Sequence, residues 1–158
     1  MAAAPHIREA LLAEETLERL EAEHYLDVLE DLLAAMGEDE VVVLSGVAWE
    51  ARQGGDTTTG VTYFICTDRG LYFPVDDSAT GRHRAVVVRR GDVAEARAAA
   101  PSDFLAADYY GDDGTHLGGI TFHPMVLVDD HIPTRTQAQM VADALGVAWS
   151  DPDFDVIG

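Results

Sequence analysis

Val61–Val75 has the sequence VTYFICTDRGLYFPV, and this stretch decides what the chain can fold into. Two runs rich in aromatic and β-branched residues stand on either side of the short polar segment Thr67–Gly70. Aromatic and β-branched side chains favour strands, and a short polar break that ends in glycine is typical of a turn. The stretch therefore predicts a β-hairpin, with one strand before Thr67 and another after Gly70.

Apolar residues with the short period of a strand continue on both sides of this hairpin. We expect further strands at 41–50, 84–90, 104–110 and 117–123, and a short one at 125–128. The segment Gly111–Gly114 predicts the turn of a second hairpin. The alanine-rich segment 93–100 instead predicts one or two helical turns.

Helical periodicity marks the two ends of the sequence. From His6 to Met36, apolar residues recur at spacings of three and four among acidic ones, which predicts a long amphipathic helix. A second amphipathic pattern, Thr134–Leu145, lies between Pro133 and Gly146 and predicts a C-terminal helix. Because no repeat or low-complexity linker interrupts the chain, we expect one domain over residues 1–158. Its parts are an N-terminal helix (1–36), a sheet with a capping helix (41–146) and an acidic tail (147–158).

The apolar stripe of the N-terminal helix is broader than a two-position coiled-coil seam, and it leaves two interpretations open. The stripe packs against the protein's own sheet, or it pairs with a second copy or a partner helix. Leu17 and Leu20 are the residues that we select as candidates for the second interpretation.

Charge is the most unusual property of the composition. The chain has 29 acidic residues against 10 basic ones, a net charge of −19, and every basic residue is arginine. The net charge is −10 over residues 1–40, 0 over 41–102 and −9 over 103–158. Such a surface repels nucleic acid and anionic membranes, so these partner classes are disfavoured. Only the neutral middle third would attract an acidic partner.

The single cysteine, Cys66, excludes an intrachain disulfide and lies within an apolar strand, where a buried structural thiol is expected. The first ten residues lack the features of a signal peptide, and no apolar run approaches the ~20 residues of a membrane span. The sequence therefore predicts a cytoplasmic protein without membrane insertion.

From about residue 41 to residue 146 the chain resembles the bacterial pleckstrin-homology-like (PH-like) domains. In those families a strand enters a Thr-Asp-Arg-type turn and leaves through an apolar strand, as Ile65–Tyr72 does here. A later strand leads into a short polar segment, as Val86–Val93 does, and a C-terminal amphipathic helix plugs the open end of the sheet. The resemblance implies an α+β fold: a strongly bent antiparallel sheet, or partly open barrel, with a C-terminal capping helix.

For function, the resemblance implies a bacterial binding or assembly module, usually without catalysis, although the fold hosts unrelated functions. Phosphoinositide binding by eukaryotic relatives needs a basic cluster in the first hairpin loop. The corresponding segment here, Arg52–Gly60, lacks such a cluster.

The densest basic group in the sequence consists of Arg82, Arg84, Arg89 and Arg90, together with His83. Guanidinium groups suit the recognition of carboxylates and phosphates, and these four arginines are our candidates for partner binding. The alternative is that they pair with the protein's own abundant acids. If they bind a partner, an acidic peptide is favoured over nucleic acid.

A segment rich in histidine and aspartate, residues 112–131, is the other candidate for a metal or catalytic site. His116, His123 and His131 lack the tight spacing of a metal site, and we expect neither metal nor cofactor. Catalytic fingerprints such as GxSxG or a Walker loop are missing from the sequence, which leaves us no candidate catalytic residues. Whether this segment forms a site stays open.

The sequence thus favours a non-catalytic interaction or assembly module. It would bind protein, or a second copy of itself, through the N-terminal helix or the arginine-bearing strand at 84–90. The alternative hypothesis is a small enzyme or ligand-binding protein with a pocket between sheet and helix. An inward cluster of His116, His123 and an aspartate would favour that alternative, whereas separate, solvent-facing positions would favour the interaction module.

Overall fold

The structure of the 158-residue chain is a computed structural model, which describes residues 27–58, 60–99, 104–126 and 132–149. The strands are β1 (Val42–Gln53), β2 (Asp56–Thr57), β3 (Thr62–Thr67), β4 (Gly70–Asp76), β5 (His83–Arg89), β6 (Glu95–Ala99), β7 (Ala106–Tyr110) and β8 (His116–Val126). The helices are α3 (Leu29–Ala35), α4 (Thr134–Leu145) and the short 3₁₀ turn η2 (Arg90–Asp92).

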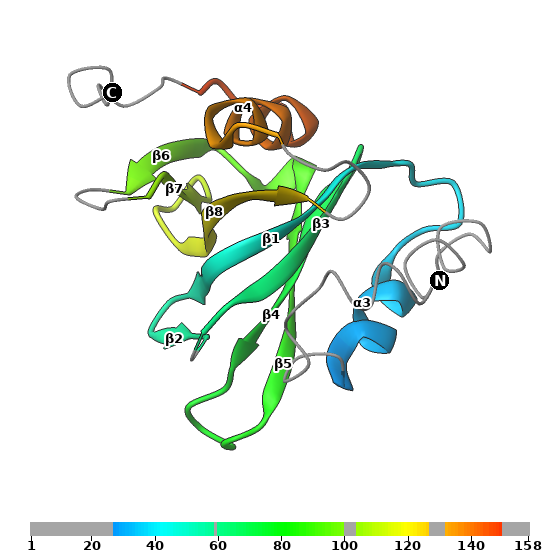
Figure 1. The fold of residues 1–158 in the computed structure, drawn as a ribbon, viewed down its shortest axis with the longest axis vertical. Helices are drawn as coiled ribbons and strands as arrows, with labels where there is room; N and C mark the ends of the chain where they lie inside the picture. The colour runs from blue at the N-terminus through cyan, green and yellow to red at the C-terminus, as the bar shows by residue number, and fades with distance from the viewer. Residues whose placement is uncertain (1–26, 59, 100–103, 127–131, 150–158) are drawn as a thin grey trace.

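The strands form one curled sheet, in the order β5-β4-β3-β1-β8-β7-β6, and β2 pairs with the end of β1 (Figure 1). Every pair of neighbouring strands is antiparallel. The long strand β1 belongs to both halves of the sheet, because most of its length pairs with β3 and its later part pairs with β8. It therefore forms the fold's central element.

The hairpin predicted from residues 61–75 is confirmed as β3 and β4. Ile65 pairs with Tyr72 and Cys66 with Leu71. The turn between them is held by Thr67, whose hydroxyl oxygen accepts hydrogen bonds from the backbone N–H groups of Arg69 (3.1 Å) and Gly70 (3.2 Å). The Thr-Asp-Arg-Gly segment thus forms the turn through its own threonine side chain.

The sheet bends because β1 and β8 slip in register and because small residues let other groups approach. The β1–β8 pairing shifts between Gly46 and Ala48, and again between Ala48 and Glu50. In β8, a Cβ atom at Gly118 would lie 2.6 Å from the ring of Phe73. This glycine therefore allows the close approach of Phe73.

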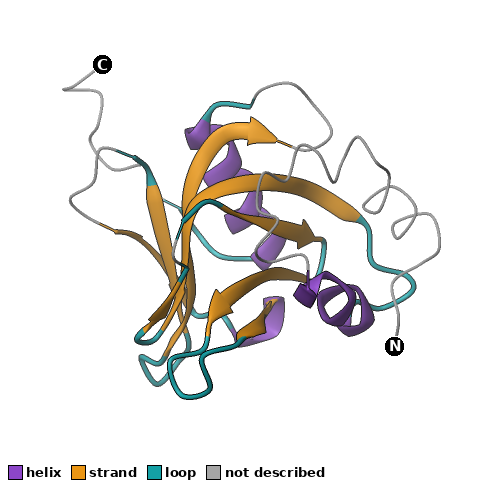
Figure 2. Cartoon of the chain, turned by 60° about the horizontal axis from the view of Figure 1, so that its bottom comes forward, coloured by secondary structure: helices purple, strands orange, loops and turns teal. Residues whose placement is uncertain are grey.

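Two hydrophobic clusters, one on each side of the sheet, hold the fold together. The larger one lies between the concave face and α4, and includes Phe64, Phe122 and Leu145. The second lies between the outer face and α3, and includes Leu32, Leu33 and Tyr63. Figure 2 shows how strongly the strands curve, and Figure 1 shows α4 across one end of the sheet and α3 beside β5. The predicted fold class is confirmed: an α+β arrangement of a strongly bent antiparallel sheet with a C-terminal capping helix.

The C-terminal helix has the predicted bounds, Thr134–Leu145. Its first residue follows Pro133, and it ends at Gly146, whose φ of 74° lies in the left-handed region that glycine adopts without strain. The backbone N–H of Val147 donates to the carbonyl of Ala142 (3.0 Å), which completes this cap.

Two predictions about secondary structure are wrong. Helical turns are predicted at 93–100, but the described residues 93–99 form none: Glu95–Ala99 is the edge strand β6, in which Glu95 pairs with Tyr110 and Ala99 with Ala106. Hydrogen bonding to β7 overrides the helix propensity of the alanines. Met125 and Val126 belong to β8 itself and do not start a separate strand, while residues 127–131 lie outside the described residues.

The predicted N-terminal helix is described only in its last part. The α-helix begins at Leu29, after a 3₁₀ turn at Asp27 and Val28, so the described part is short. Residues 1–26, which include Leu17 and Leu20, lie outside the described residues. Within the described ranges, each helix is too short or too polar to cross a lipid bilayer.

Candidate functional site

The four predicted arginines divide between the two ends of β5. Arg84 lies at the start of this strand, and Arg82 in the turn that precedes it. Arg89 ends the strand and Arg90 begins η2. Because a strand rises about 3.4 Å per residue, roughly 17–20 Å separates the two pairs. The four arginines therefore do not form one site.

At the start of β5, the guanidinium group of Arg84 contacts other side chains of the protein. Its guanidinium donates to the side-chain oxygen of Gln53 and, at 2.7 Å, to a carboxylate oxygen of Asp56, and Asp77 lies 3.9 Å away. Arg82 is exposed in the hairpin turn. Arg84 therefore agrees with the alternative that the arginines pair with the protein's own acids.

At the other end, Arg89 and Arg90 line a pocket of about 480 Å³ together with Arg69. The remaining lining residues are Gly91, Leu145 and Gly146. Three parts of the fold meet here: the β3–β4 turn, the end of β5 with η2, and the C-terminal end of α4 (Figure 1). All three arginines are exposed, so the pocket, which we call the arginine pocket, is open to solvent.

Backbone pairing fixes the positions of the three arginines. Gly70 pairs with Arg89 across β4 and β5. The backbone N–H of Arg90 donates to the carbonyl of Arg69 (3.0 Å), which carries this pairing beyond the end of the strands. The arrangement thus follows from the register of the deciding hairpin.

The guanidinium groups differ in how far their charge is already compensated. Arg69 donates two hydrogen bonds to Asp39, at 2.9 and 2.7 Å, and these bonds lower the pKa of Asp39 below its usual value. Arg89 donates only to uncharged groups, the hydroxyl of Tyr72 (3.5 Å) and the carbonyl of Ala35 (3.3 Å). Its positive charge therefore lacks a carboxylate partner among the described residues.

Arg90 is the third member, and its guanidinium lies against the end of α4. A Cβ atom at Gly146 would lie only 3.0 Å from Nε of Arg90, so the glycine makes room for this side chain. Among the described residues, no carboxylate contacts Arg90. Arg89 and Arg90 thus share the property that neither contacts a carboxylate of the described residues, whereas Arg69 is paired with Asp39.

The buried side chain of Glu40 holds the β3–β4 turn, which contributes Arg69 to the pocket. Glu40 is 2% exposed and accepts hydrogen bonds from the hydroxyls of Thr67 and Tyr72, both at 2.6 Å, and from the backbone N–H of Gly37. Burial, and next the hydrogen bond to Glu40, raise the pKa of Tyr72, so its hydroxyl stays protonated and donates. This network links the β3–β4 turn to the end of α3.

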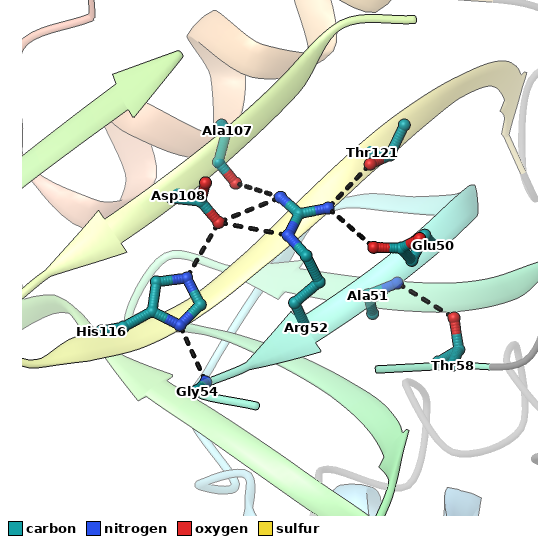
Figure 3. Close-up of polar contacts among 9 residues, drawn as sticks. All are labelled: Glu50, Ala51, Arg52, Gly54, Thr58, Ala107, Asp108, His116 and Thr121. Atoms are coloured by element: carbon teal, nitrogen blue, oxygen red, sulfur yellow. Dashed lines mark hydrogen bonds and ion pairs between the residues drawn. The ribbon is translucent and has the colours of Figure 1, made fainter. Parts of the chain in front are cut away.

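A second polar cluster lies on the outer face of the sheet, around Arg52 of β1 (Figure 3). Its guanidinium donates to Asp108 of β7 at 3.0 and 3.3 Å, to Thr121 at 2.8 Å and, more weakly, to Glu50 and the carbonyl of Ala107. The cluster ties three neighbouring strands together. Its arginine is saturated by internal acceptors and does not resemble a binding group.

His116 belongs to this cluster, and both of its ring nitrogens are engaged. Nε2 lies 2.9 Å from Asp108, and Nδ1 accepts a hydrogen bond from the backbone N–H of Gly54 at 2.9 Å (Figure 3). His123 lies elsewhere on β8, with its ring centroid 4.3 Å from that of Trp49. His123 directly follows Phe122 and therefore lies on the face opposite the core residues Ile120 and Phe122. His116 reaches Asp108 because the pairing of β7 with β8 shifts in register between Tyr109 and Tyr110.

The described residues therefore do not bring His116 and His123 together around a cavity. No group of three or more His, Cys, Asp or Glu side chains suited to a metal ion occurs among these residues, and His131 lies outside them. Cys66 is completely buried, and burial raises the pKa of its thiol to about 12, which makes it a poor nucleophile.

Arg69 is the pocket arginine that the sequence does not single out. It belongs to the turn motif and is isolated from the basic group at 82–90. An explicit strand register would have found it, since pairing Gly70 with Arg89 places Arg69 next to Arg90.

Comparisons with known proteins found little similarity. No protein-family model and no curated protein matches the chain. Among solved structures, the Vps36 N-terminal PH domain matches with a TM-score of 0.49 and 14% sequence identity, over 78% of this chain and 92% of that one. The strand order and the capping helix described above carry the fold assignment.

Proposed function

We propose that this chain is a non-catalytic protein-interaction module whose arginine pocket binds an acidic segment of a partner protein. The observation that carries this proposal is the meeting of Arg69, Arg89 and Arg90 around one solvent-open pocket of about 480 Å³. Guanidinium groups bind carboxylates through paired, charge-assisted hydrogen bonds. Arg89 and Arg90 still have donors to offer, because neither contacts a carboxylate among the described residues.

The kind of partner follows from charge. A net charge of −19 repels nucleic acid and anionic lipid over most of the surface, whereas a short acidic peptide would touch only the surroundings of Arg89 and Arg90. The separate, outward-facing positions of His116 and His123 favour this interaction module over the small enzyme that we considered as the alternative.

A direct test uses a fluorescein-labelled hexaglutamate peptide and fluorescence anisotropy at low ionic strength. We expect the wild-type chain to bind it, and Arg89→Ala/Arg90→Ala to bind at least fivefold more weakly. The matched control is Arg82→Ala/Arg97→Ala, which removes the same charge from exposed positions outside the pocket and should change the affinity less than twofold. Equal losses in both double variants would reduce the effect to net charge and overturn the proposal.

Self-association through the N-terminal segment is a second route to assembly, as predicted from the sequence. In α3, the apolar residues Leu29, Leu32 and Leu33 are already buried against the protein's own sheet, so a partner would have to use residues before Leu29. Sedimentation velocity of Leu17→Ala/Leu20→Ala beside the wild type tests this. A monomeric wild type would remove the idea, and so would an unchanged oligomer in the variant.

A further inference from the structure

We propose that the outer edge of β6 pairs with β6 of a second copy of this chain, in a weak two-fold symmetric dimer whose two sheets join. The strand order ends at β5 on one side and at β6 on the other, and among the described strands β6 pairs only with β7. The other edge strand, β5, has α3 beside it, whereas β6 lies at the margin of the sheet (Figure 1). The backbone groups along a sheet edge are a template for another strand.

Charge decides which strand fits this edge. The side chains of Glu95 and Arg97 are 51% and 58% exposed and form an ion pair of 2.7 Å, so they lie on the same face of β6. Antiparallel pairing of two β6 strands about Ala96 places Glu95 of each copy opposite Arg97 of the other. Opposite charges at directly opposed positions stabilise a strand pair, and like charges destabilise it. The order Glu-Ala-Arg is therefore complementary to itself.

The same rule excludes the neighbouring registers. A pair centred on Glu95 would place two carboxylates opposite each other, and a pair centred on Arg97 would do the same with two guanidinium groups. In the register centred on Ala96, the opposite face of the strand brings Ala94 of one copy opposite Ala98 of the other. These small side chains leave the approach of the two backbones unobstructed.

Arg97 is held where this pairing needs it. The central carbon of its guanidinium group lies 4.6 Å from the ring centroid of Tyr110, on the neighbouring strand β7. A guanidinium group has about five N–H donors, and the ion pair with Glu95 of the same copy does not use them all. The remaining donors can bind Glu95 of the second copy, which gives four alternating charges across the two-fold axis.

The dimer should be weak, because β6 is short and both copies are acidic. Its five residues span about 17 Å, and a strand pair of this length buries less than the roughly 1,200 Å² of a stable interface. The net charge of −19 on each copy adds repulsion. We therefore expect a dissociation constant on the order of 0.1 mM. The arginine pocket has no residue of β6 in its lining, so the dimer and the proposed function are tested separately.

Sedimentation velocity of the full-length protein, at several concentrations on both sides of that value, tests the dimer. The wild type should show a reversible monomer–dimer equilibrium. Glu95→Arg and Arg97→Glu should each weaken it at least fivefold, because both place like charges opposite each other. They change the net charge of −19 by two in opposite directions, to −17 and −21, so a general charge effect cannot weaken both.

The decisive control is the exchange Glu95→Arg/Arg97→Glu, which keeps the net charge and restores an opposite charge across the axis. It should dimerise within twofold of the wild type. A wild type that stays monomeric at every concentration overturns the proposal. So does a double variant as weak as the single ones, or single variants that dimerise like the wild type.

A crosslinking experiment tests the register itself. Ala96→Cys puts two cysteines directly opposite each other, with Cα atoms about 4.5–5.5 Å apart, within the range that a disulfide spans. Ala98→Cys is the matched control, half-buried on the same face of β6 but about 14 Å from its counterpart in this register. Cys66 is completely buried, so the wild type serves as the blank.

With copper phenanthroline as the oxidant, Ala96→Cys should give at least tenfold more disulfide-linked dimer on a non-reducing gel than Ala98→Cys. Equal crosslinking of the two variants would contradict the register, and the absence of crosslinked Ala96→Cys would contradict the β6 interface. Both results would leave peptide binding by the arginine pocket unaffected.

Discussion

At the scale of single residues, the burial of the Glu40 side chain matters most for the structure. A carboxylate taken out of water is destabilising unless it is hydrogen-bonded, and here Thr67, Tyr72 and Gly37 supply the donors. Its neighbour Asp39 faces solvent and holds Arg69. Two adjacent acids thus serve opposite purposes, and sequence alone does not separate them, because the difference lies in which direction each side chain points.

Replacing Glu40 by alanine should lower the free energy of unfolding by about 2–3 kcal/mol, since the hydroxyls of Thr67 and Tyr72 lose their shared acceptor inside the protein. Urea unfolding followed by circular dichroism measures this. Glu38→Ala, at an exposed position of the same loop, should cost less than about 0.5 kcal/mol. Equal costs would mean that the buried network contributes nothing special.

Gly119 provides a second prediction at this scale. A Cβ atom there would lie 2.0 Å from Oδ1 of Asp108, 2.7 Å from a guanidinium nitrogen of Arg52 and 3.0 Å from the backbone oxygen of Ala107. Gly119→Ala should therefore destabilise the fold by about 1–3 kcal/mol, the usual cost of overpacking. Gly55→Ala is the control, because open space surrounds that position. A Gly119→Ala protein as stable as this control would show that the Arg52 cluster moves aside without cost.

At the scale of elements, local sequence patterns identify the strands that pair with close neighbours. The hairpins β3–β4 and β7–β8 follow from their turns, and α4 from its flanking Pro133 and Gly146. The edge strand β6 was missed because its alanines favour a helix, and only its pairing with β7 makes it extended. The candidate site was predicted in part for the same reason. Arg89 and Arg90 stand out in the sequence, whereas Arg69 and the end of α4 join them only through tertiary structure.

The tie between β2 and β5 yields a prediction about pH. Hydrogen bonds from Arg84, and then from Ser78, lower the pKa of Asp56 from its ordinary 3.8 to about 2. A carboxyl group whose pKa is depressed by folding stabilises the native state above the unfolded pKa, and this stabilisation is lost as the pH falls through the folded pKa. The wild type should thus exceed Asp56→Asn in stability at pH 5, by a margin that shrinks between pH 4 and pH 2.

Urea midpoints at pH 5, 4, 3 and 2 measure this margin. In an Arg84→Ala background the same substitution should lose most of its pH dependence, because the group with the largest effect on the pKa of Asp56 is gone. A margin that stays constant from pH 5 to pH 2 would refute the tie.

At the scale of the whole molecule, the dominant property is the net charge of −19. Self-repulsion of that size destabilises the compact state, and salt screens it over about 10 Å at 0.1 M. Exposed ion pairs such as Arg69–Asp39 weaken under the same conditions, but each contributes only about 0–1 kcal/mol. The repulsion involves many more charges and should decide the sign of the salt effect.

Raising NaCl from 10 to 200 mM should therefore raise the melting temperature by about 3 °C, which corresponds to about 1 kcal/mol for a chain of this size. Calorimetry measures the shift, and choline chloride in place of NaCl controls for specific binding of sodium. A lower melting temperature in both salts would mean that the attractive pairs outweigh the repulsion.

The shared strand β1 also affects how the protein can be made. Its partner β3 follows it closely, but its other partner, β8, ends only at Val126. While the polypeptide leaves the ribosome, one edge of β1 cannot be fully paired until that residue has emerged, and an open strand edge is a template for pairing with other chains. The nascent protein is therefore most vulnerable to aggregation during the synthesis of residues 54–126, after which β8 covers this edge.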